Sequence, residues 1–356
     1  MNGAQIVQHL QPGGIERLVL NLLRFSSSRV NLKVIALEGH REQALQHWPE
    51  LRQFQDKLIF LNKPAGFKPL IFFQLRRLVK QHKIQFIHSH HLGPLFYSRP
   101  ISRFMGLQHI HTEHDSWHLE NPKARKQTQL LAAGKHFSLI ADANHIAKDL
   151  QRYLKRNVDH VILNGIDSQI FTLGDPIKAR AQLRLPPDCF LIGAAGRLVA
   201  EKGMGLLLQA LAQLPLHYHI AIAGIGPQQS ILKQQAKQLG IQYRVHWLNL
   251  VDDMPLFYQA IDLFCLPSTN EGLPLSLLEA QSCGKWVVAT DVGAVREVIT
   301  SYSGHIIADR SVKALTDAIL NAPLQPSAPM IREHIIKNTD VRIMVEQYEK
   351  IWSSAL

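Results

Sequence analysis

Residues 264–286, FCLPSTNEGLPLSLLEAQSCGKW, constrain the fold of this chain more than any other stretch. They continue an apolar run that begins at Ile261 and is short enough for a buried strand. Pro267 ends that run, because a proline cannot donate a hydrogen bond to a sheet. Pro274 suits the first position of a helix, and Gly284 is typical of the residue just after one. The stretch therefore predicts a strand, a polar loop and a helix.

Two carboxylates bracket the start of this helix. Glu271 lies in the loop beside the helix N-terminus, where free N–H groups and the helix dipole favour anions, and Glu279 lies about two turns into the helix. Glu271 would repel a phosphate bound there, so it is better suited to face sugar hydroxyls, while Glu279 can accept hydrogen bonds from a ribose diol. An acidic first turn and a solvated surface glutamate explain the same two residues without a ligand.

The neighbouring motifs favour the ligand-binding interpretation. Glu271 and Glu279 form an E-x7-E pattern, which is followed by Cys283-Gly284 and an apolar run, and the segment GRLVAEKG precedes it at residues 196–203. This combination resembles the retaining glycosyltransferases of family 4, which have the GT-B fold. The resemblance extends over nearly the whole chain and is densest over residues 190–307.

The GT-B fold implies the α/β class, with two Rossmann-like, doubly wound domains that face each other across a cleft. Alternating strand and helix signals in both halves support two such domains independently. We expect an acceptor-side domain at residues 1–167, to which a C-terminal helix at 341–356 crosses back, and a nucleotide-sugar-binding domain at 168–340. The cleft would hold the active site.

Composition and cysteine usage predict a cytoplasmic protein. The chain has 356 residues, of which 46% are hydrophobic, and no apolar run reaches the 18 residues that a membrane-spanning helix needs. The first ten residues lack the basic segment and apolar core of a secretory signal. Cys189, Cys265 and Cys283 have no metal-binding spacing, and Cys265 lies in an apolar run, as a core residue would.

The positive charge is concentrated in the first half. Residues 1–165 contain 23 Lys and Arg against 11 Asp and Glu, whereas the remainder contains 16 against 17. This excess predicts an acidic partner, either a phosphorylated acceptor or the inner face of the cytoplasmic membrane, or it serves solubility alone. No nucleic-acid-binding motif accompanies it, so we expect no nucleic-acid partner. The candidate membrane contacts lie on or just after a helix predicted at 69–82: Arg76, Arg77, Lys80 and Lys83. Packing of that helix on a sheet explains its apolar residues as well.

Other elements of the first half follow from apolar periodicity. Strands are expected at 5–10, 32–37, 58–61, 84–88 and 139–143, and helices at 15–25, 69–82 and 146–154. Gly13 and Gly14 lie between the first strand and the first helix, where they form either a backbone cradle for a ligand or a plain tight turn. In the resembling family this loop approaches the donor phosphates and the acceptor, which implies a donor contact at Gly14.

Histidines gather at residues 109–115, HIHTEHD. We expect His109 and His111 to lie on alternate sides of a strand, so that the cluster does not converge on one metal ion, although His111, His114 and Glu113 remain an alternative ligand set. The segment resembles a family loop in which one histidine faces the donor sugar. His114 fits that position best and His111 is the alternative; a neutral imidazole can donate or accept a hydrogen bond there.

In the second half, strands are expected at 190–194, 219–223, 245–248, 261–266 and 286–290, with helices at 206–214 and 341–352. Gly224 and Gly226 suggest a dinucleotide-binding loop, but Gln229 replaces its third glycine and the segment lies in mid-chain. A dehydrogenase is therefore excluded. Asn249 stands where the resembling family commonly has glycine, and asparagine also tolerates left-handed backbone.

The resemblance implies a donor site at the following positions: Gly14, Gly196, Arg197, Lys202, Leu250, Glu271, Gly272, Leu273 and Glu279. Arg197 and Lys202 flank one turn, where their charges would stabilise the departing diphosphate. Gly272 and Leu273 would offer backbone N–H groups. The catalytic residues would be His114, Arg197, Lys202 and Glu271.

We therefore expect a retaining glycosyltransferase that moves a sugar from a UDP- or GDP-linked donor to a glycan or lipid-linked acceptor, in polysaccharide or lipopolysaccharide assembly. The chain contains no Asp-x-Asp pattern to hold a metal-bound diphosphate, so we expect neither a metal ion nor a cofactor. Two alternatives remain. One is a non-catalytic sugar- or membrane-binding subunit that partners an active transferase, and the other is a nucleotide-sugar epimerase on the same fold.

Overall fold

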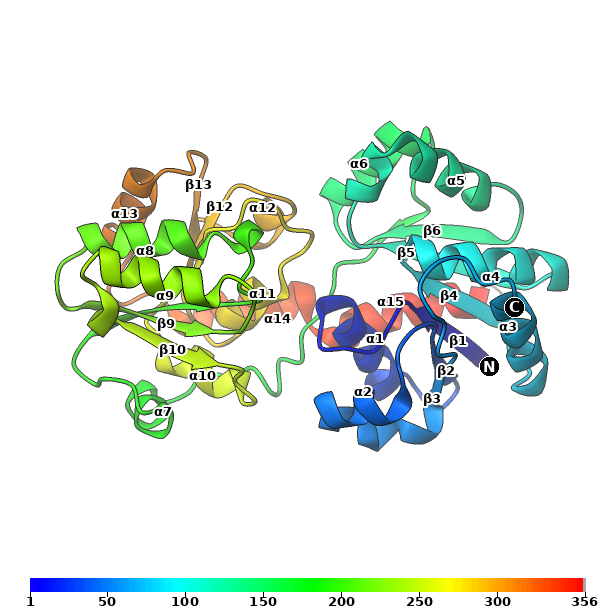
Figure 1. The fold of residues 1–356 in the computed structure, drawn as a ribbon, viewed down its shortest axis with the longest axis horizontal. Coiled ribbons are helices and arrows are strands. Elements are labelled where there is room, and N and C mark those ends of the chain that lie inside the picture. The colour runs from blue at the N-terminus through cyan, green and yellow to red at the C-terminus, as the bar shows by residue number, and fades with distance from the viewer. Residues whose placement is uncertain (355–356) are drawn as a thin grey trace. The chain divides into compact units, whose positions relative to one another are not determined.

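A computed structural model describes residues 1–354 of the 356-residue chain. Its contacts divide the chain into two compact units, residues 1–165 together with the segment from Val341 onward, and residues 166–340. Each unit is a parallel β-sheet with helices on both faces (Figure 1). The division lies two residues before the boundary expected at 167, and residues 355–356 of the expected last helix lie outside the described part.

The first unit contains a seven-stranded sheet in the order β3-β2-β1-β4-β5-β6-β7. Its strands are β1 (Asn2–Val7), β2 (Asn31–Ala36), β3 (Leu58–Phe60), β4 (Phe86–His90), β5 (Gln108–Glu113), β6 (Phe137–Ala141) and β7 (His160–Val161). All neighbouring strands run parallel. The central strands are buried along most of their length, as a parallel sheet covered on both faces requires.

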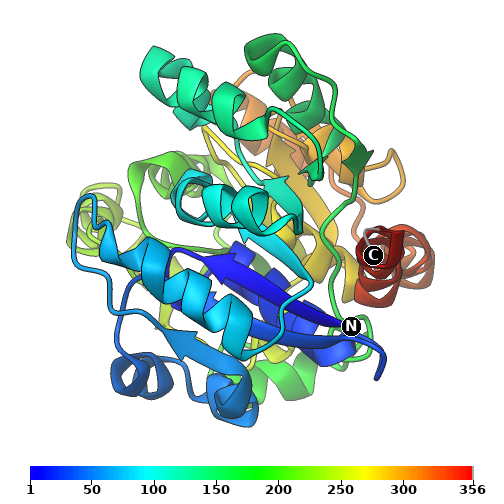
Figure 2. The ribbon, with the colours of Figure 1, turned by 90° about the vertical axis from the view of Figure 1, so that its right-hand side faces the viewer.

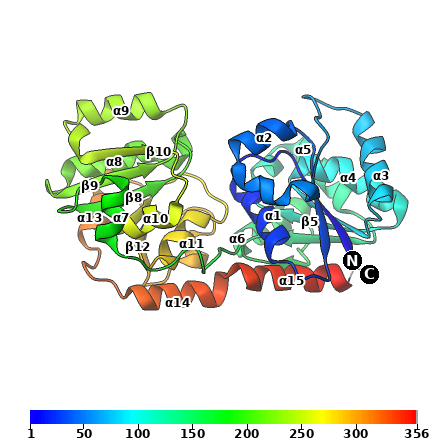
Figure 3. The ribbon, with the colours of Figure 1, turned by 90° about the horizontal axis from the view of Figure 1, so that it is seen from below.

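Helices cover both faces of this sheet. They are α1 (Gly14–Phe25), α2 (Arg41–His47), α3 (Leu70–Gln81), α4 (Leu92–Met105), α5 (Pro122–Ala132), α6 (Asn144–Leu154) and α15 (Val341–Ser354), with the short helices η1 (Pro49–Lys57) and η2 (Trp117–Glu120). On one face α3 packs beside α4, and both appear in front of the strands in light blue and cyan in Figure 2. On the other face α1 packs against α15 (Figure 3).

Helix α3 shows how periodicity directs this packing. Ile71, Leu75 and Val79 recur every four residues, and all three are buried against the sheet. Burial of such side chains contributes about 1.5–3 kcal/mol each. The expectation that the helix packs on a sheet is therefore confirmed, and its opposite side, which includes Phe73, faces solvent.

The second unit contains a six-stranded sheet in the order β10-β9-β8-β11-β12-β13. Its strands are β8 (Phe190–Ala195), β9 (Tyr218–Ala223), β10 (Val245–Asn249), β11 (Leu263–Leu266), β12 (Trp286–Thr290) and β13 (Gly304–Ile307). Its helices are α7 (Pro176–Leu183), η3 (Ala200–Lys202), α8 (Met204–Gln213), α9 (Gln229–Gln238), η4 (Gln242–Arg244), α10 (Met254–Ala260), α11 (Leu275–Ser282), α12 (Val295–Val298), α13 (Val312–Leu320) and α14 (Ala328–Thr339). Helices α8, α9 and α13 share one core with the sheet, and α14 packs along α11 (Figure 3).

Both sheets reverse their strand order once. In the first unit the reversal lies between β1 and β4, and in the second it lies between β8 and β11. At such a point the loops that leave the carboxyl ends of the two strands diverge and open a crevice, which is where doubly wound sheets bind ligands. The loops after β1, β4, β8 and β11 are therefore the places to look for a site.

Three strands are shifted from the expected residues. The sequence predicted 5–10, 84–88 and 139–143, whereas β1, β4 and β6 occupy Asn2–Val7, Phe86–His90 and Phe137–Ala141. Leu10, Ile84 and Ala143 are buried although they lie outside the strands. Because the core extends beyond the hydrogen-bonded sheet, apolar runs alone do not mark where a buried parallel strand begins or ends.

No helix within residues 1–354 combines the length and the apolar character needed to cross a bilayer.

Candidate active site

The turn after β8 places two predicted cations at the carboxyl end of the second sheet. Gly196 follows β8, Arg197 is exposed, and Lys202 is the last residue of η3. Gly203 has a left-handed φ of 66°, and a Cβ atom there would lie 1.9 Å from the carbonyl oxygen of Pro267. The turn therefore lies directly against the end of β11, a contact that requires glycine.

Lys202 meets Glu271 at this contact. The lysine Nζ lies 2.6 Å from Oε1 and 2.9 Å from Oε2, and the Ser268 hydroxyl donates to Oε1 over 2.6 Å. The Glu271 side chain is 8% exposed and that of Lys202 is 27% exposed. The carboxylate is thus fixed by two donors, while the ammonium remains accessible to an anionic group of a ligand.

Backbone contacts hold the Glu271 loop in place. The Thr269 N–H donates to the carbonyl oxygen of Glu201 over 2.7 Å, and the Ala294 N–H donates to that of Gly272 over 3.0 Å. Gly293 has a φ of 55°, and a Cβ atom there would lie 2.1 Å from the carbonyl oxygen of Glu271. The turn after β12 therefore braces the loop from the side opposite the turn after β8.

Several donors beside this cluster have no acceptor in the described chain. Within residues 1–354 no group accepts from the N–H of Gly272 or Leu273, and the Arg197 guanidinium forms neither an ion pair nor a hydrogen bond. Two cations and two free N–H groups can bind the oxygens of a diphosphate. The structure joins Gly196, Lys202 and Glu271 by contacts and sets Arg197 on the same turn.

The loops after β9 and β10 complete this edge of the sheet. Cβ atoms on Gly224 and Gly226 would lie 1.9 Å and 2.4 Å from the carbonyl oxygens of Gly196 and Leu198. These glycines therefore serve close packing against the Arg197 turn, which explains them without a dinucleotide. Asn249 has a left-handed φ of 58°, so asparagine does adopt the backbone for which the family commonly uses glycine.

Leu250 and Glu279 take no part in the contacts that join Lys202, Glu271 and Ser268. Leu250 follows β10 and is 71% exposed, so its side chain is open to a ligand. Glu279 is the fifth residue of α11, just over one turn into the helix instead of the two turns expected, because α11 begins only at Leu275. The Tyr258 hydroxyl donates to Glu279 Oε2 over 2.7 Å, which ties this carboxylate to α10. Their donor contacts remain predictions.

In the first unit, Glu16 occupies the expected Gly13–Gly14 cradle. Its side chain is buried, and its Oε2 would lie 2.4 Å from a Cβ atom on Gly13, while Oε1 lies 3.2 Å from His9 Nδ1. Burial raises the pKa of Glu16 above its ordinary value. The contact between Gly14 and a donor phosphate remains a prediction, and this neighbouring carboxylate weighs against it.

His114 lies in a buried hydrogen-bond network at the carboxyl end of the first sheet. Its Nδ1 is 3.1 Å from Asp142 Oδ2, and its Nε2 is 3.1 Å from His90 Nδ1. Asn164 donates to the same Asp142 oxygen over 3.0 Å, and His90 Nε2 lies 2.8 Å from Gln5 Oε1. Both ring nitrogens of His114 are therefore engaged within the protein, which argues against a nitrogen-to-sugar contact by this residue.

The expectation that His109 and His111 lie on opposite sides of a strand was wrong. The Ser89 hydroxyl lies 2.8 Å from both His109 Nε2 and His111 Nδ1, so the two imidazoles share a face. The reason is the two-residue period of a strand, which returns every second side chain to the same side. His111 is fully buried, with Nε2 at 3.0 Å from Glu113 Oε1, and does not reach a ligand.

The metal-ligand alternative loses support from the same geometry. His111 points to Glu113, whereas His114 points to Asp142. His118 lies beside Glu113 and Asp115, each at 3.5 Å. Burial lowers the pKa of His118, but the neighbouring carboxylates of Asp115 and Glu113 outweigh it and raise that pKa to about 10. Burial raises the pKa of Glu113, but His111 and His118 outweigh it and hold the pKa well below its ordinary range.

Sequence reasoning missed several residues that position the site. Ser268 and Asp142 each lie just beyond the carboxyl end of a strand, at β11 and β6, and this position was the one signal that would have found them. His90 ends β4 and resembles an ordinary strand residue until its partner His114 is known. The partners of Asp142 lie 22 and 28 residues away in the chain, so no local pattern connects them.

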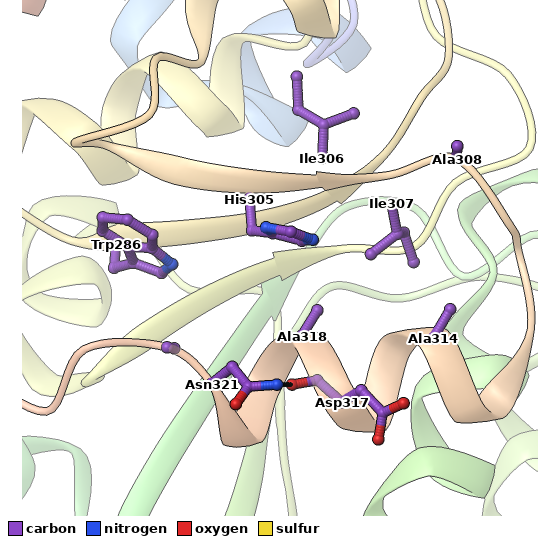
Figure 4. Close-up of a pocket in the computed structure, with 10 residues that line it drawn as sticks. Trp286, His305, Ile306, Ile307, Ala308, Ala314, Asp317, Ala318 and Asn321 are labelled. Carbon is purple, nitrogen blue, oxygen red and sulfur yellow. Dashed lines mark hydrogen bonds between the residues drawn. The ribbon is translucent and has the colours of Figure 1, made fainter.

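A separate hollow of about 320 Å³ lies between β13 and α13 (Figure 4). Trp286, His305 and Ile307 line it from the sheet. Asp317 of α13 and Asn321, the residue just after that helix, line the other side. None of the predicted site residues borders it. It is therefore distinct from the crevice at β8 and β11.

Comparison with known proteins identifies two family models, one for each half of the chain. The model described as Glycosyltransferase Family 4 matches residues 12–170, and the model described as Glycosyl transferases group 1 matches residues 176–341. The lipopolysaccharide core biosynthesis mannosyltransferase LpsB of Rhizobium meliloti is 37% identical over 170 residues, which cover 44% of this chain and 48% of LpsB. A D-inositol 3-phosphate glycosyltransferase of a Mycobacterium species (strain JLS) is 37% identical over 163 residues, 42% of this chain and 37% of that enzyme. The chain thus spans about half the length, or less, of the curated relatives it matches.

Solved structures share the fold over the whole chain. The structure of Anabaena HepE in complex with UDP has a TM-score of 0.85 at 23% identity, and covers 99% of this chain and 100% of that one. WaaG, a glycosyltransferase involved in lipopolysaccharide biosynthesis, has a TM-score of 0.74 at 17% identity, and covers 98% of this chain and 99% of its own. The fold is therefore GT-B, with two Rossmann-like domains. Together with the two family models, this places the chain among the group 1 glycosyltransferases of family 4.

Proposed function

We propose that the protein is a glycosyltransferase that moves a sugar from a nucleotide-sugar donor to a glycan or lipid-linked acceptor. The observation that carries this proposal is the cluster of Lys202, Glu271 and Ser268, with the free donors of Arg197, Gly272 and Leu273 beside it. It offers positive charge and N–H groups for a diphosphate, next to a fixed carboxylate for sugar hydroxyls. HepE has been solved with UDP and with UDP-glucose, which supports a nucleotide-sugar donor here.

The proposed transfer retains the configuration at the anomeric carbon. The bond from that carbon to the donor phosphate breaks, and the bond to the acceptor oxygen forms on the same face of the sugar. The acceptor proton passes to an oxygen of the leaving diphosphate, whose developing charge Arg197 and Lys202 stabilise. Glu271 and Glu279 bind hydroxyls and serve neither as acid nor as nucleophile. His114, with both ring nitrogens engaged, holds the loop of the first unit in position.

We propose that the reaction needs no metal ion and no cofactor. The chain has no Asp-x-Asp pattern, and two side-chain cations can supply the electrostatic stabilisation that a metal would give. Turnover should therefore persist in excess EDTA. Activity that EDTA abolishes and that magnesium or manganese restores would contradict this part of the proposal.

The test of function is a mass-spectrometric screen of UDP- and GDP-linked sugars with the purified protein. We expect release of the nucleoside diphosphate from one of them, slowly to water and faster once a suitable acceptor is added. Binding of a nucleotide sugar without turnover would favour a non-catalytic subunit, and conversion to an isomeric nucleotide sugar would favour an epimerase. The relative LpsB makes lipopolysaccharide core extracts a rational first acceptor.

We further propose that the first unit binds an anionic membrane surface through α3 and the C-terminal end of α4. Phe73 and Phe104 are 69% and 74% exposed, and Arg76 lies over the Phe104 ring at 5.0 Å. Exposed Arg77 and Lys80 extend the basic surface. Aromatic side chains beside basic ones suit the boundary between lipid headgroups and acyl chains, and this surface would place the protein on the inner face of the cytoplasmic membrane.

A further inference from the structure

The hollow between β13 and α13 exists because the helix presents small side chains to the sheet. Trp286, His305 and Ile307 lie on the side of the strands that is turned towards α13 (Figure 4). From the helix, Ala314 and Ala318 lie about one turn apart and point at these strands. Both alanines are too short to fill the gap, so a space of about 320 Å³ remains, which is within the range of small-molecule pockets.

The protein does not use the polar groups around this hollow for its own contacts. Within residues 1–354, the side chains of His305 and Asp317 form no hydrogen bond and no ion pair, either with each other or with another group. Asn321 donates to the carbonyl oxygen of Asp317 over 2.8 Å, which leaves its side-chain oxygen free. The indole N–H of Trp286 is buried and has no acceptor in the same part of the chain. Both walls therefore offer hydrogen-bonding groups to a ligand.

The hollow opens beside an edge of the second sheet. β13 is the last strand in the order of that sheet, and within the described chain no strand pairs with its outer edge. His305 and Asp317 are exposed, so the rim can be reached from solvent. All residues of the hollow belong to the second unit, and its shape depends on that unit alone. A long ligand can thus occupy the hollow with one of its units and continue past the sheet edge.

We propose that this hollow binds one sugar unit of a glycan, as a second carbohydrate site apart from the transfer site. The Trp286 indole stacks on the apolar face of the sugar ring, and His305, Asp317 and Asn321 bond its hydroxyls. The proposal rests on the proposed function for the source of the glycan, which is the acceptor or the lengthened product. The hollow holds that chain while the transfer site acts on another part of it.

The lining favours a neutral sugar over a charged ligand. A phosphate would meet the carboxylate of Asp317, and no lysine or arginine lines the hollow. A quaternary ammonium group is bound best between several aromatic faces, whereas Trp286 is the one indole, phenol or phenyl ring in this lining. Sugar hydroxyls both donate and accept, which matches a carboxylate, an amide oxygen and an imidazole together.

The experiment measures sugar binding by isothermal titration calorimetry. The probes are oligosaccharides of glucose, galactose and mannose, and dephosphorylated lipopolysaccharide core oligosaccharide. Trp286→Leu removes the stacking surface, and Ala314→Leu fills the hollow without removing a polar group. We expect the unmodified protein to bind at least one probe, and each variant to bind it more weakly by about tenfold or more.

Two controls separate the hollow from the rest of the second unit. Trp247→Leu is the matched control, because Trp247 is also half-buried and packs on the same core, but lies on β10 at the other edge of the sheet. Lys202→Ala alters the proposed donor site and leaves the hollow intact. With the fold checked by circular dichroism, both should bind the oligosaccharide within about twofold of the unmodified protein.

Each other outcome contradicts a stated part of the account. Hollow variants that bind as tightly as the unmodified protein, an equal loss in either control, or an unmodified protein that binds none of the probes would overturn the proposal. Binding of benzyltrimethylammonium in place of the sugars, abolished in Trp286→Leu, would overturn the assignment to carbohydrate. Sugar binding that the hollow variants lose, in a protein that transfers no sugar, contradicts only the proposed function.

Discussion

At the scale of single residues, Lys202 has two partners in the proposed function. Its ammonium pairs with Glu271 in the free protein, and the donor diphosphate must compete with that carboxylate for it. The guanidinium of Arg197, by contrast, has no protein partner among residues 1–354. We infer that Arg197 makes the first contact with the diphosphate and that Lys202 contacts it next.

The contacts of His118 with Glu113 and Asp115 should make the stability of the protein depend on pH. Asp115 and Glu113 raise the pKa of His118 to about 10, against about 6.5 in an unfolded chain. Because the folded-state pKa is raised, the protonated His118 stabilises the protein. This stabilisation is fully present below pH 6.5 and is lost as the pH rises through 10. We expect His118→Gln to lower the Tm by at least about 2 °C at pH 6, with the difference disappearing towards pH 10.

The control for this prediction is His145→Gln. His145 lies 3.7 Å from Asp149 but is 43% exposed, so its ion pair contributes little. Its Tm should match that of the unmodified protein at pH 6. A Tm difference in His118→Gln that is constant from pH 6 to pH 10 would show that the ionic interaction is absent.

At the scale of helices and strands, the sequence predicted elements where one face is buried and missed others where the pattern is weak. Helices α1, α3 and α6 begin and end within one or two residues of expectation, since their apolar residues recur with helical spacing. Strand β13 has four residues and α4 contains Pro100, so neither produces a clear period.

The next prediction concerns α3. Replacement of Arg76, Arg77, Lys80 and Lys83 by Gln should reduce binding to liposomes that contain anionic lipid, because each basic residue near such a surface contributes on the order of 1 kcal/mol. The affinity for nucleotide should stay nearly unchanged. Binding measured by liposome sedimentation should weaken with added salt and be weak on neutral liposomes.

The exposed aromatic residues supply the matched variant for this surface. Replacement of Phe73 and Phe104 by Ser should weaken the binding that remains at high salt, since that part depends on apolar contact. An unmodified protein that ignores anionic liposomes at low salt would rule out the membrane proposal and leave the charge to a soluble acidic acceptor or to solubility.

At the scale of the whole molecule, the E-x7-E pattern and the GRLVAEKG segment were enough to predict the two-domain GT-B fold. They also predicted that Lys202 and Glu271 serve one site, and the structure joins the two at 2.6 Å. The sequence could not predict the network around His114, because its members come from four separate segments of the chain. They lie within β1, at the end of β4, and after β6 and β7: Gln5, His90, Asp142 and Asn164. The brace at Gly293 was hidden for the same reason, since its contact with Glu271 exists only in the folded chain.

The central claim is that the turn after β8 stabilises the leaving diphosphate of a nucleotide sugar. The most direct measurement is the rate of sugar transfer by Arg197→Ala and Lys202→Ala, with the fold checked by circular dichroism and with Lys178→Ala, an exposed lysine on α7, as the control. Loss of a preorganised charge at a developing anion predicts that each site variant is slower by about 10² or more, while the control keeps its rate. Near-normal rates in both site variants, with the fold intact, would contradict the account.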